Sequence, residues 1–162
     1  MVVKNSGSEK VSWSEVEKLI NIISEKIILM PREFSSISTI SRGGLVPARL
    51  LADRLGFDVI LVDQKKISSD SIFIDDIYDS GNTFKKIINK VDSPSNFVYV
   101  TLFARRGKKY PKQLIYAKKT SNDSYIVYQW DKLEYKRITK YNVKFLKFIL
   151  LESSFSNLHI GF

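Results

Sequence analysis

The sequence predicts an α/β fold in which helices flank a central, mainly parallel β-sheet. Segments rich in β-branched and aromatic residues alternate along the chain with segments of helical periodicity, and this alternation is typical of parallel sheets. Two polar turns follow predicted strands, which is where ligands bind in sheets of this kind. The 162 residues, 44% of them hydrophobic, fit a single domain that spans residues 1–162.

The first expected element of the fold is an amphipathic helix. Ser12 and Glu15 have the spacing of a capping box, in which the two side chains bond backbone N–H groups at the start of a helix. Apolar residues then recur at helical spacing, namely Val16, Leu19, Ile20, Ile23 and Ile27. We therefore expect one face of this helix to be buried.

The other elements alternate along the chain. The expected strands cover residues 36–40, 58–62, 71–74, 97–103, 115–117 and 125–128. Two further helices are expected, at residues 46–55 and 83–91. Gly56 follows the first of them as its C-cap, because glycine tolerates the left-handed conformation that ends many helices.

Composition excludes several kinds of site. The chain has no cysteine, so disulfides, thiolate-bound metals and a thiol nucleophile are excluded. Residues 1–10 are polar and no apolar run approaches the ~20 residues that cross a bilayer, so we expect a cytoplasmic protein with no membrane partner. The net charge of +9 is consistent with binding nucleic acid, an anionic membrane or a phosphorylated small molecule, but also with scattered lysines that have no functional meaning.

The most informative segment covers residues 72–83. An apolar strand ends in two adjacent carboxylates, Asp75 and Asp76, a third follows at Asp79, and the small polar loop of residues 80–83 opens a helix. The backbone N–H groups of such a loop and the positive end of the helix favour a phosphate group. The carboxylates before it suit sugar hydroxyls and Mg²⁺. Taken alone, the acidic pair would also be explained by a solvated turn with a good helix cap.

A second polar turn, Ser41-Arg42-Gly43-Gly44, lies between the first expected strand and the helix at residues 46–55. The carboxyl ends of parallel strands meet at one edge of a sheet, so this turn and the acidic turn should lie on the same rim. The sequence therefore predicts a ligand site built from two loops.

The complete pattern of residues 72–83 resembles the signature with which type I phosphoribosyltransferases bind phosphoribosyl pyrophosphate (PRPP). Residues 40–47 resemble the pyrophosphate loop of the bacterial xanthine-guanine phosphoribosyltransferases. Three further segments match that family in the same order, namely residues 11–13, 100–104 and 125–131. The resemblance covers about residues 11–135 and leaves residues 136–162 unassigned.

The resemblance implies the type I phosphoribosyltransferase fold, with a small base-binding hood. It also implies a Mg²⁺-dependent enzyme of purine salvage that transfers the 5-phosphoribosyl group from PRPP to a 6-oxopurine base and releases pyrophosphate. The partners would be PRPP and a purine base. We expect a homodimer or homotetramer, and we do not expect nucleic acid as a partner.

Roles of individual residues follow from the same resemblance. Asp75 and Asp76 would bind the ribose hydroxyls and Mg²⁺, and Asp79 would act as general acid or base at the purine. The residues that would hold the 5′-phosphate are Ser80, Gly81, Asn82 and Thr83. Those that would hold the pyrophosphate are Ser41, Arg42, Gly43 and Gly44, in a loop that has a non-proline cis peptide in the family. Tyr125 would stack on the purine, and Ile126 would offer it backbone groups.

Three departures from the family bear on function. The long lid that the family has between two strands is replaced by residues 63–70, a connection with little room for a lid. Arg105 stands where the family has a lysine that reads the 6-oxo group. Arginine can donate the same hydrogen bond, but Arg105 could also lie on the surface, and Arg106 could be the residue that points inward. Val127 replaces an acid near the 2-position of the base, so a xanthine or guanine preference does not carry over.

A second function stays open at this point. The short connection and the net charge of +9 favour a PRPP- or nucleotide-sensing regulatory protein with weak or no catalysis, as in the pyrimidine attenuation and purine repressor families. However, no winged-helix segment is evident, and the basic and aromatic residues are too dispersed to predict an RNA surface. A phosphoribosyltransferase acting on a non-purine base is a third alternative.

Overall fold

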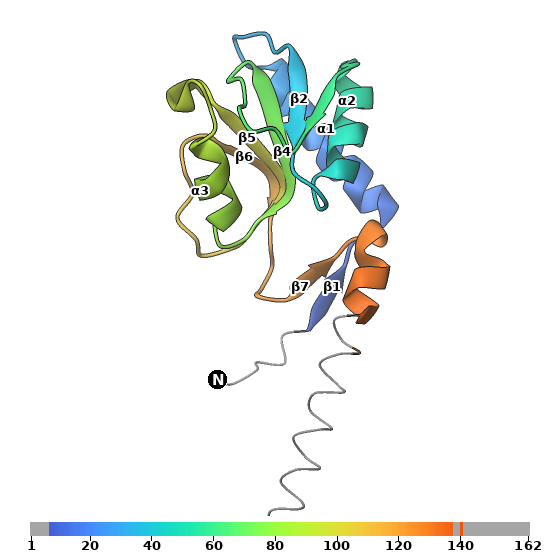
Figure 1. Ribbon diagram of the computed structural model, residues 1–162. Coiled ribbons are helices and arrows are strands. Elements are labelled where there is room, and N and C mark those ends of the chain that lie inside the picture. The colour runs from blue at the N-terminus through green and yellow to red at the C-terminus, as the bar shows by residue number, and fades with distance from the viewer. Residues whose placement is uncertain (1–6, 138–139, 141–162) are drawn as a thin grey trace, which may run out of the picture.

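The computed structural model describes residues 7–137 and residue 140, and Figure 1 shows their arrangement. Five strands form a sheet in the order β3-β2-β4-β5-β6. These strands are β2 (Ser36–Thr39), β3 (Ile60–Val62), β4 (Ser71–Tyr78), β5 (Val98–Ala104) and β6 (Leu114–Lys119). Every neighbouring pair in this sheet is parallel, so the predicted α/β class is confirmed.

Helices cover both faces of the sheet (Figure 1). They are α1 (Trp13–Ile28), α2 (Leu45–Leu55) and α3 (Asn82–Ile88), with two short 3₁₀ turns, η1 (Pro94–Asn96) and η2 (Gln129–Asp131). α1 and α2 pack on one face and α3 on the other. Residues 132–137 are also helical. Among the described residues, no helix combines the length and the hydrophobicity that spanning a membrane requires.

Local signals set the ends of α1 and α2. The side chain of Ser12 accepts a hydrogen bond from the backbone N–H of Glu15 at 3.1 Å, so the N-cap of α1 is the predicted one. Gly56 ends α2 in the left-handed conformation, with φ 78°, and donates its N–H to the carbonyl of Ala52. Both caps were predictable because they depend on a few neighbouring residues.

Several elements differ in length from the prediction, β4 and α3 among them. β4 continues to Tyr78 rather than ending at residue 74, so Asp75 and Asp76 lie within the strand. The reason is tertiary: β5 pairs with β4 as far as Tyr78 opposite Ala104, and this pairing outweighs the low strand propensity of aspartate. α3 ends at Ile88, before the predicted residue 91.

Alternate residues of β4 point to opposite faces of the sheet and build two cores. Ile72 and Ile74 are fully buried in the core under α1 and α2. Phe73 is buried on the α3 face, where its ring stacks on that of Tyr99 with centroids 5.2 Å apart. Burying a side chain of this size contributes about 1.5–3 kcal/mol, so the alternation in β4 stabilises both layers.

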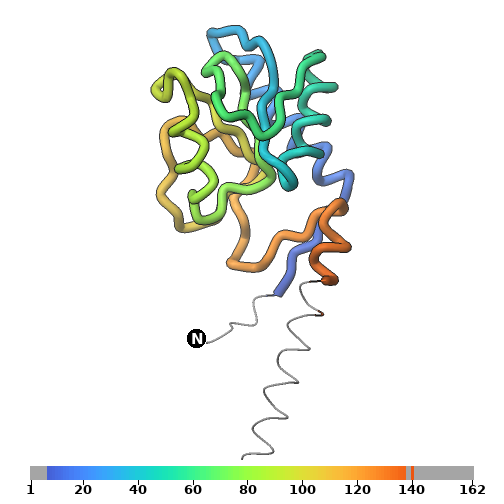
Figure 2. The backbone as a smooth tube through the Cα atoms, viewed as in Figure 1, coloured from blue at the N-terminus to red at the C-terminus, as the bar shows by residue number. Residues whose placement is uncertain are grey.

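A second, two-stranded parallel sheet lies below the main sheet in Figure 1 and matches the hood that the resemblance implies. It pairs β1 (Ser8–Lys10) with β7 (Tyr125–Val127). Figure 2 shows the two ends of the described chain running side by side there. β1 was not predicted, because its three residues are polar and pair with β7 through their backbone.

The connection from β3 to β4, residues 63–70, is held along its length. Ile67, in its middle, is buried and forms a parallel bridge with Val91, the residue that the prediction had placed in α3. The backbone N–H of Ser69 donates to the carboxylate of Asp92 at 2.8 Å. The connection is therefore packed against the body of the protein.

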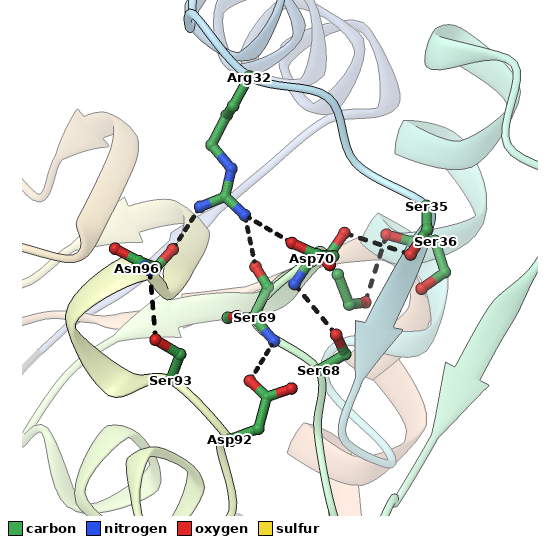
Figure 3. Close-up of polar contacts among 10 residues, drawn as sticks. Arg32, Ser35, Ser36, Ser68, Ser69, Asp70, Asp92, Ser93 and Asn96 are labelled. Carbon is green, nitrogen blue, oxygen red and sulfur yellow. Dashed lines mark hydrogen bonds and ion pairs between the residues drawn. The ribbon is translucent and has the colours of Figure 1, made fainter.

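Arg32 holds the end of this connection that leads into β4 (Figure 3). Its Nη2 donates to the carbonyl of Ser69 at 2.9 Å and to Oδ1 of Asp70 at 3.2 Å. Its Nη1 donates to the carbonyl of Asn96 in η1. One guanidinium thus joins three segments: the loop before β2, the β3–β4 connection and the turn before β5.

Candidate active site

A cavity of about 280 Å³ opens at the carboxyl ends of β2 and β4. Its lining residues are Ile40, Ser41, Gly43, Asp75, Asp76, Ile77, Tyr78, Asp79, Ser80, Gly81, Thr83, Phe84 and Tyr99. Residues of both predicted loops are among them, so the two loops meet on one rim of the sheet. Of the expected phosphate and pyrophosphate ligands, Arg42, Gly44 and Asn82 lie outside this lining.

The two adjacent carboxylates differ in their partners. Asp75 is buried, and its Oδ1 accepts a hydrogen bond from the backbone N–H of Asp76 at 2.9 Å. Its Oδ2 accepts one from the hydroxyl of Tyr99 at 3.1 Å. Oδ1 of Asp76 accepts from the backbone N–H of Ile77 at 2.7 Å, whereas Oδ2 receives no hydrogen bond from the described residues. Asp76 therefore keeps one oxygen for a ligand.

Burial raises the pKa of both carboxyl groups. For Asp75, loss of hydration is the largest cause, and the hydrogen bonds from Asp76 and Tyr99 oppose it. For Asp76, loss of hydration comes first and the charge of Asp75 second, and its pKa is raised well above the ordinary value. Within the described residues, no ion pair compensates either group. The pair therefore favours a cation or hydroxyl donors.

Gly43 brings the first loop against the acidic pair. A Cβ at this position would lie 2.9 Å from Cγ and Oδ2 of Asp76, closer than side chains pack. Gly44 is buried, and a Cβ there would collide with Oγ1 of Thr39 and lie 2.8 Å from the carbonyl oxygen of Ile74. Both positions therefore require glycine for the loop to approach β4 this closely.

Asp63, which follows β3, holds the same loop. Its Oδ1 accepts the backbone N–H of Ser41 at 2.9 Å, and its own N–H donates to the carbonyl of Thr39 at 3.1 Å. Asp63 adopts a left-handed φ of 52°, and the hydrogen bond from Ser41 lowers the pKa of its carboxyl. The peptide between Ser41 and Arg42 is cis, in the loop where the resemblance implies one. The sequence analysis missed Asp63, since a single acid after a strand carries no signal.

The side chain of Arg42 points away from the acidic cavity. Its Nη2 donates to Oε1 of Glu134 at 2.8 Å. Both residues line a second cavity, of about 390 Å³, together with Leu45, Val46, Trp130, Asp131, Leu133 and Arg137. The side chain of Arg42, an expected pyrophosphate ligand, therefore lies outside the cavity that Ser41 and Gly43 line, because Glu134 binds it.

The polar turn after β4 leads directly into α3. Gly81 has φ 81°, and a Cβ there would lie 2.6 Å from the hydroxyl oxygen of Tyr78. The Oγ of Ser80 accepts the backbone N–H of Asn82 at 3.3 Å. Ser80, Gly81 and Thr83 line the cavity, while Asn82 is exposed outside it. The turn therefore places three of the four expected phosphate ligands beside the acidic pair.

Asp79 is paired with Arg105. Nε of Arg105 lies 2.9 Å from Oδ1 of Asp79, and Nη2 lies 3.3 Å from Oδ2. The Arg105 side chain is 9% exposed and that of Asp79 is 57% exposed, so the pair runs from the interior to the cavity mouth. Arg106 is exposed. Of the two arginines, Arg105 is the one that points inward.

Two carbonyls fix Arg105 from the other side. Its Nη1 donates to the carbonyls of Asn122 at 3.2 Å and Ser124 at 2.9 Å, just before β7. An arginine has five N–H donors. Four are used by Asp79 and these carbonyls, which leaves one N–H of Nη2 without a partner among the described residues.

The expected base-binding residues of β7 lie outside the acidic cavity. Tyr125 is 45% exposed, and its ring stacks on that of Tyr135 with centroids 5.6 Å apart and an interplanar angle of 21°. Ile126 is buried, and its backbone pairs with Glu9 of β1. Both residues therefore belong to the two-stranded hood and not to the lining of the acidic cavity.

Two tyrosines support the acidic pair, and the sequence analysis missed both. Tyr99 is buried, and loss of hydration followed by the charge of Asp75 raises its pKa, so its hydroxyl is a neutral donor. Tyr128 is also buried and donates its hydroxyl to the carbonyl of Asp76 at 2.8 Å. Its ring stacks on Trp130 with centroids 4.5 Å apart. In sequence, aromatic residues within strands predict a core, and nothing distinguishes these two from other core aromatics.

Comparisons with known proteins agree with the resemblance. The chain is 28% identical to the xanthine-guanine phosphoribosyltransferase of Chromohalobacter salexigens over 142 residues, which cover 75% of this chain and 82% of that protein. No protein-family model matches the chain.

Solved structures share its fold. A purine phosphoribosyltransferase from Pyrococcus horikoshii superposes with a TM-score of 0.62 at 21% identity, covering 77% of this chain and 94% of that one. The xanthine-guanine-hypoxanthine phosphoribosyltransferase of Helicobacter pylori gives a TM-score of 0.64 at 14% identity, covering 82% and 99%. The fold class that the resemblance implied is therefore confirmed.

Proposed function

We propose that this chain, which is similar in sequence and fold to xanthine-guanine and other purine phosphoribosyltransferases, is itself a purine phosphoribosyltransferase. It would transfer the 5-phosphoribosyl group from PRPP to a 6-oxopurine and release pyrophosphate. One observation carries this proposal. One cavity is lined by loop residues Ser41 and Gly43, by the acidic pair and by three residues of the turn after β4, namely Ser80, Gly81 and Thr83.

This cavity offers a complementary group for each part of PRPP. The turn at residues 80–83 suits the 5′-phosphate, since Gly81 is left-handed and Ser80 and Thr83 carry hydroxyls. The free oxygen of Asp76 suits a ribose hydroxyl. The backbone of Ser41 and Gly43 suits the pyrophosphate, with Arg42 joining it only after leaving Glu134.

The carboxylates also fit Mg²⁺. In the part of the chain that the structure describes, no three acidic or histidine side chains are grouped so that they could hold a metal ion by themselves. Mg²⁺ is commonly held by one or two carboxylates together with substrate phosphates, and Asp75 and Asp76 supply that number. When bound with PRPP, the ion would neutralise the charge that develops on the departing pyrophosphate.

Asp79 is the residue that would accept a proton from the purine. As pyrophosphate leaves, C1 of the ribose becomes cationic and the purine nitrogen attacks it, so the purine must lose a proton. Asp79 stands at the cavity mouth, 57% exposed, with its carboxylate oriented by Arg105. In this position it can accept that proton as a general base.

Preference for a 6-oxopurine is the finer part of the proposal. The remaining N–H of Arg105 can only donate, so it suits the 6-oxo group and would leave an exocyclic amine unpaired. Failing to pair a buried polar group costs ~1–3 kcal/mol, or roughly ten- to hundredfold in selectivity. The exposed ring of Tyr125 would stack on any purine once it parts from Tyr135.

A turnover assay tests the proposal. Purified protein with PRPP and Mg²⁺ is offered hypoxanthine, guanine, xanthine and adenine in turn, and the nucleoside monophosphate is measured by chromatography. We expect product from hypoxanthine or guanine ahead of adenine. The double variant Asp75→Asn with Asp76→Asn should give none, and Asp79→Asn should lose ~10²–10⁴ in rate while still binding PRPP.

The same samples separate the alternatives. A PRPP-dependent rise in melting temperature without any product would favour a PRPP-sensing regulator. No rise at millimolar PRPP with Mg²⁺ would overturn the proposal, because ligand at 100 times its dissociation constant should add ~2.7 kcal/mol. The predicted homodimer or homotetramer is checked by light scattering on the same protein.

A further inference from the structure

Apart from the contact between the two carboxyl groups themselves, Tyr99 supplies the one side-chain hydrogen bond that the acidic pair receives from the described residues. It lies within β5, 1% exposed, and its hydroxyl donates to Oδ2 of Asp75 at 3.1 Å. Two rings fix its own: Phe73 stacks on it at 5.2 Å and 15°, and Phe84 meets it edge-on at 5.3 Å and 86°. The direction of the hydroxyl is therefore set by packing.

The position of Phe84 links this packing to the phosphate turn. Phe84 belongs to α3, which begins directly after that turn, and both Phe84 and Tyr99 line the acidic cavity. The ring of Tyr99 thus rests between β4 and α3, while its hydroxyl reaches the carboxylate. A change at this hydroxyl acts first on Asp75.

The two carboxylates differ in how many of their oxygens accept hydrogen bonds from the protein. Asp75 has both oxygens engaged, by Tyr99 and by the backbone N–H of Asp76. The second of these bonds ties the orientation of the Asp75 carboxylate to the peptide that carries the Asp76 side chain. Asp76 then presents its free Oδ2 beside Gly43.

We propose that Tyr99 is a positioning residue for ribose recognition: it holds Asp75, and through Asp75 it aims the free oxygen of Asp76 at a ribose hydroxyl of the ligand. This inference rests on the proposed function, because the ligand is a phosphoribosyl compound. Tyr99 acts on the ligand through Asp75 in this arrangement, because Asp75 accepts its hydroxyl.

The test compares two ligands that differ by one ribose hydroxyl. Guanosine monophosphate and 2′-deoxyguanosine monophosphate are titrated by calorimetry into the unmutated protein, Tyr99→Phe and Tyr116→Phe. Tyr99→Phe keeps the ring between Phe73 and Phe84 and removes only the hydroxyl. Tyr116→Phe is the matched control, because it removes a hydroxyl on β6 from a ring that lies outside the cavity lining.

We expect the unmutated protein and Tyr116→Phe to bind the ribonucleotide about tenfold more tightly than the deoxynucleotide. In Tyr99→Phe this preference should fall to about twofold or less, mostly through weaker binding of the ribonucleotide. Equal weakening of both ligands in Tyr99→Phe would show a merely structural role and overturn the inference. So would an undiminished preference in Tyr99→Phe, or no preference in the unmutated protein. If the unmutated protein binds neither nucleotide, the proposed function itself fails.

A second comparison keeps the inference testable if Tyr99→Phe does not fold. The double variant Asp75→Asn with Tyr99→Phe removes the buried charge together with its donor, and it is compared with Asp75→Asn alone. If Tyr99 acts through Asp75, the two should bind the ribonucleotide within about twofold of each other. A tenfold or larger difference would mean that Tyr99 acts by another route, which overturns the inference.

Discussion

The guanidinium of Arg105 binds the carboxylate of Asp79 through two hydrogen bonds, with Nε 2.9 Å from Oδ1 and Nη2 3.3 Å from Oδ2. In the proposed function, one of these residues reads the base and the other takes its proton. The structure makes them a single unit, which the carbonyls of Asn122 and Ser124 anchor to the segment before β7. Substituting Arg105 should therefore disturb both selectivity and rate.

Arg105→Met should erase the preference for hypoxanthine over adenine and lower turnover by about 10–100-fold, because Asp79 loses its orienting partner. The affinity for PRPP should change by less than about threefold, since the phosphate turn and the acidic pair are untouched. Steady-state kinetics with both bases, together with PRPP titration, check this. Arg106→Met is the matched control and should behave like the unmutated protein, because Arg106 is exposed. Equal effects of the two substitutions would contradict the assignment.

Asp76→Asn should stabilise the free protein at neutral pH while weakening PRPP binding. Burial and the charge of Asp75 raise the pKa of Asp76, so the folded state holds this proton more tightly than the unfolded state does. Stability from this group is therefore greatest below its unfolded pKa of about 3.9 and falls as pH rises toward the raised folded value. Asparagine cannot ionise, so the variant does not lose folding stability as the pH rises.

Melting curves between pH 4 and pH 8 check this prediction. The melting temperature of Asp76→Asn should exceed that of the unmutated protein at pH 7, and the difference should shrink toward pH 4. Each 1 kcal/mol gained corresponds to about 2–4 °C for a domain of this size. A variant that is less stable at pH 7 would mean that the ionised carboxylate is compensated in the free protein.

Arg32→Ala should destabilise the fold by about 1–3 kcal/mol and leave PRPP affinity unchanged. The substitution leaves the carbonyls of Ser69 and Asn96 without their donor. It also loosens the three segments that lead into β2, β4 and β5, at the ends of the strands opposite the cavity. Urea unfolding and PRPP titration measure the two effects. Arg49→Ala is the control: it removes an exposed pair with Asp53 one helical turn away and should leave stability nearly unchanged.

Asp63→Ala should weaken binding of inorganic pyrophosphate about tenfold, because it frees the backbone N–H of Ser41 and the loop that this bond holds. Asp63→Asn should retain most of the affinity, since its amide oxygen can accept the same hydrogen bond and asparagine tolerates the left-handed φ. Calorimetric titration of pyrophosphate with Mg²⁺ compares the three proteins. Tighter binding by Asp63→Ala would instead show that Asp63 competes with the ligand for Ser41.

Much of the candidate site could be predicted from sequence because its parts are contiguous. The acidic pair and the turn at residues 80–83 come from one run of twelve residues, and Ser41 to Gly44 form another. The conformation of each run depends on near neighbours, as at Gly81, whose left-handed φ the turn requires. Alternating strands and helices were enough to predict that the two runs share a rim.

Contacts between residues far apart in the chain could not be predicted from the sequence. Tyr99 donates to Asp75 across 24 positions, Arg105 meets Asp79 across 26, and Glu134 draws Arg42 away across 92. No local pattern encodes such partners, because they depend on strand register and on the packing of side chains. Local sequence patterns were thus enough to predict the fold class and the two loops that meet at one rim. Tertiary packing decided how those residues are oriented, since a side chain's direction is set by whatever neighbour the fold brings to it.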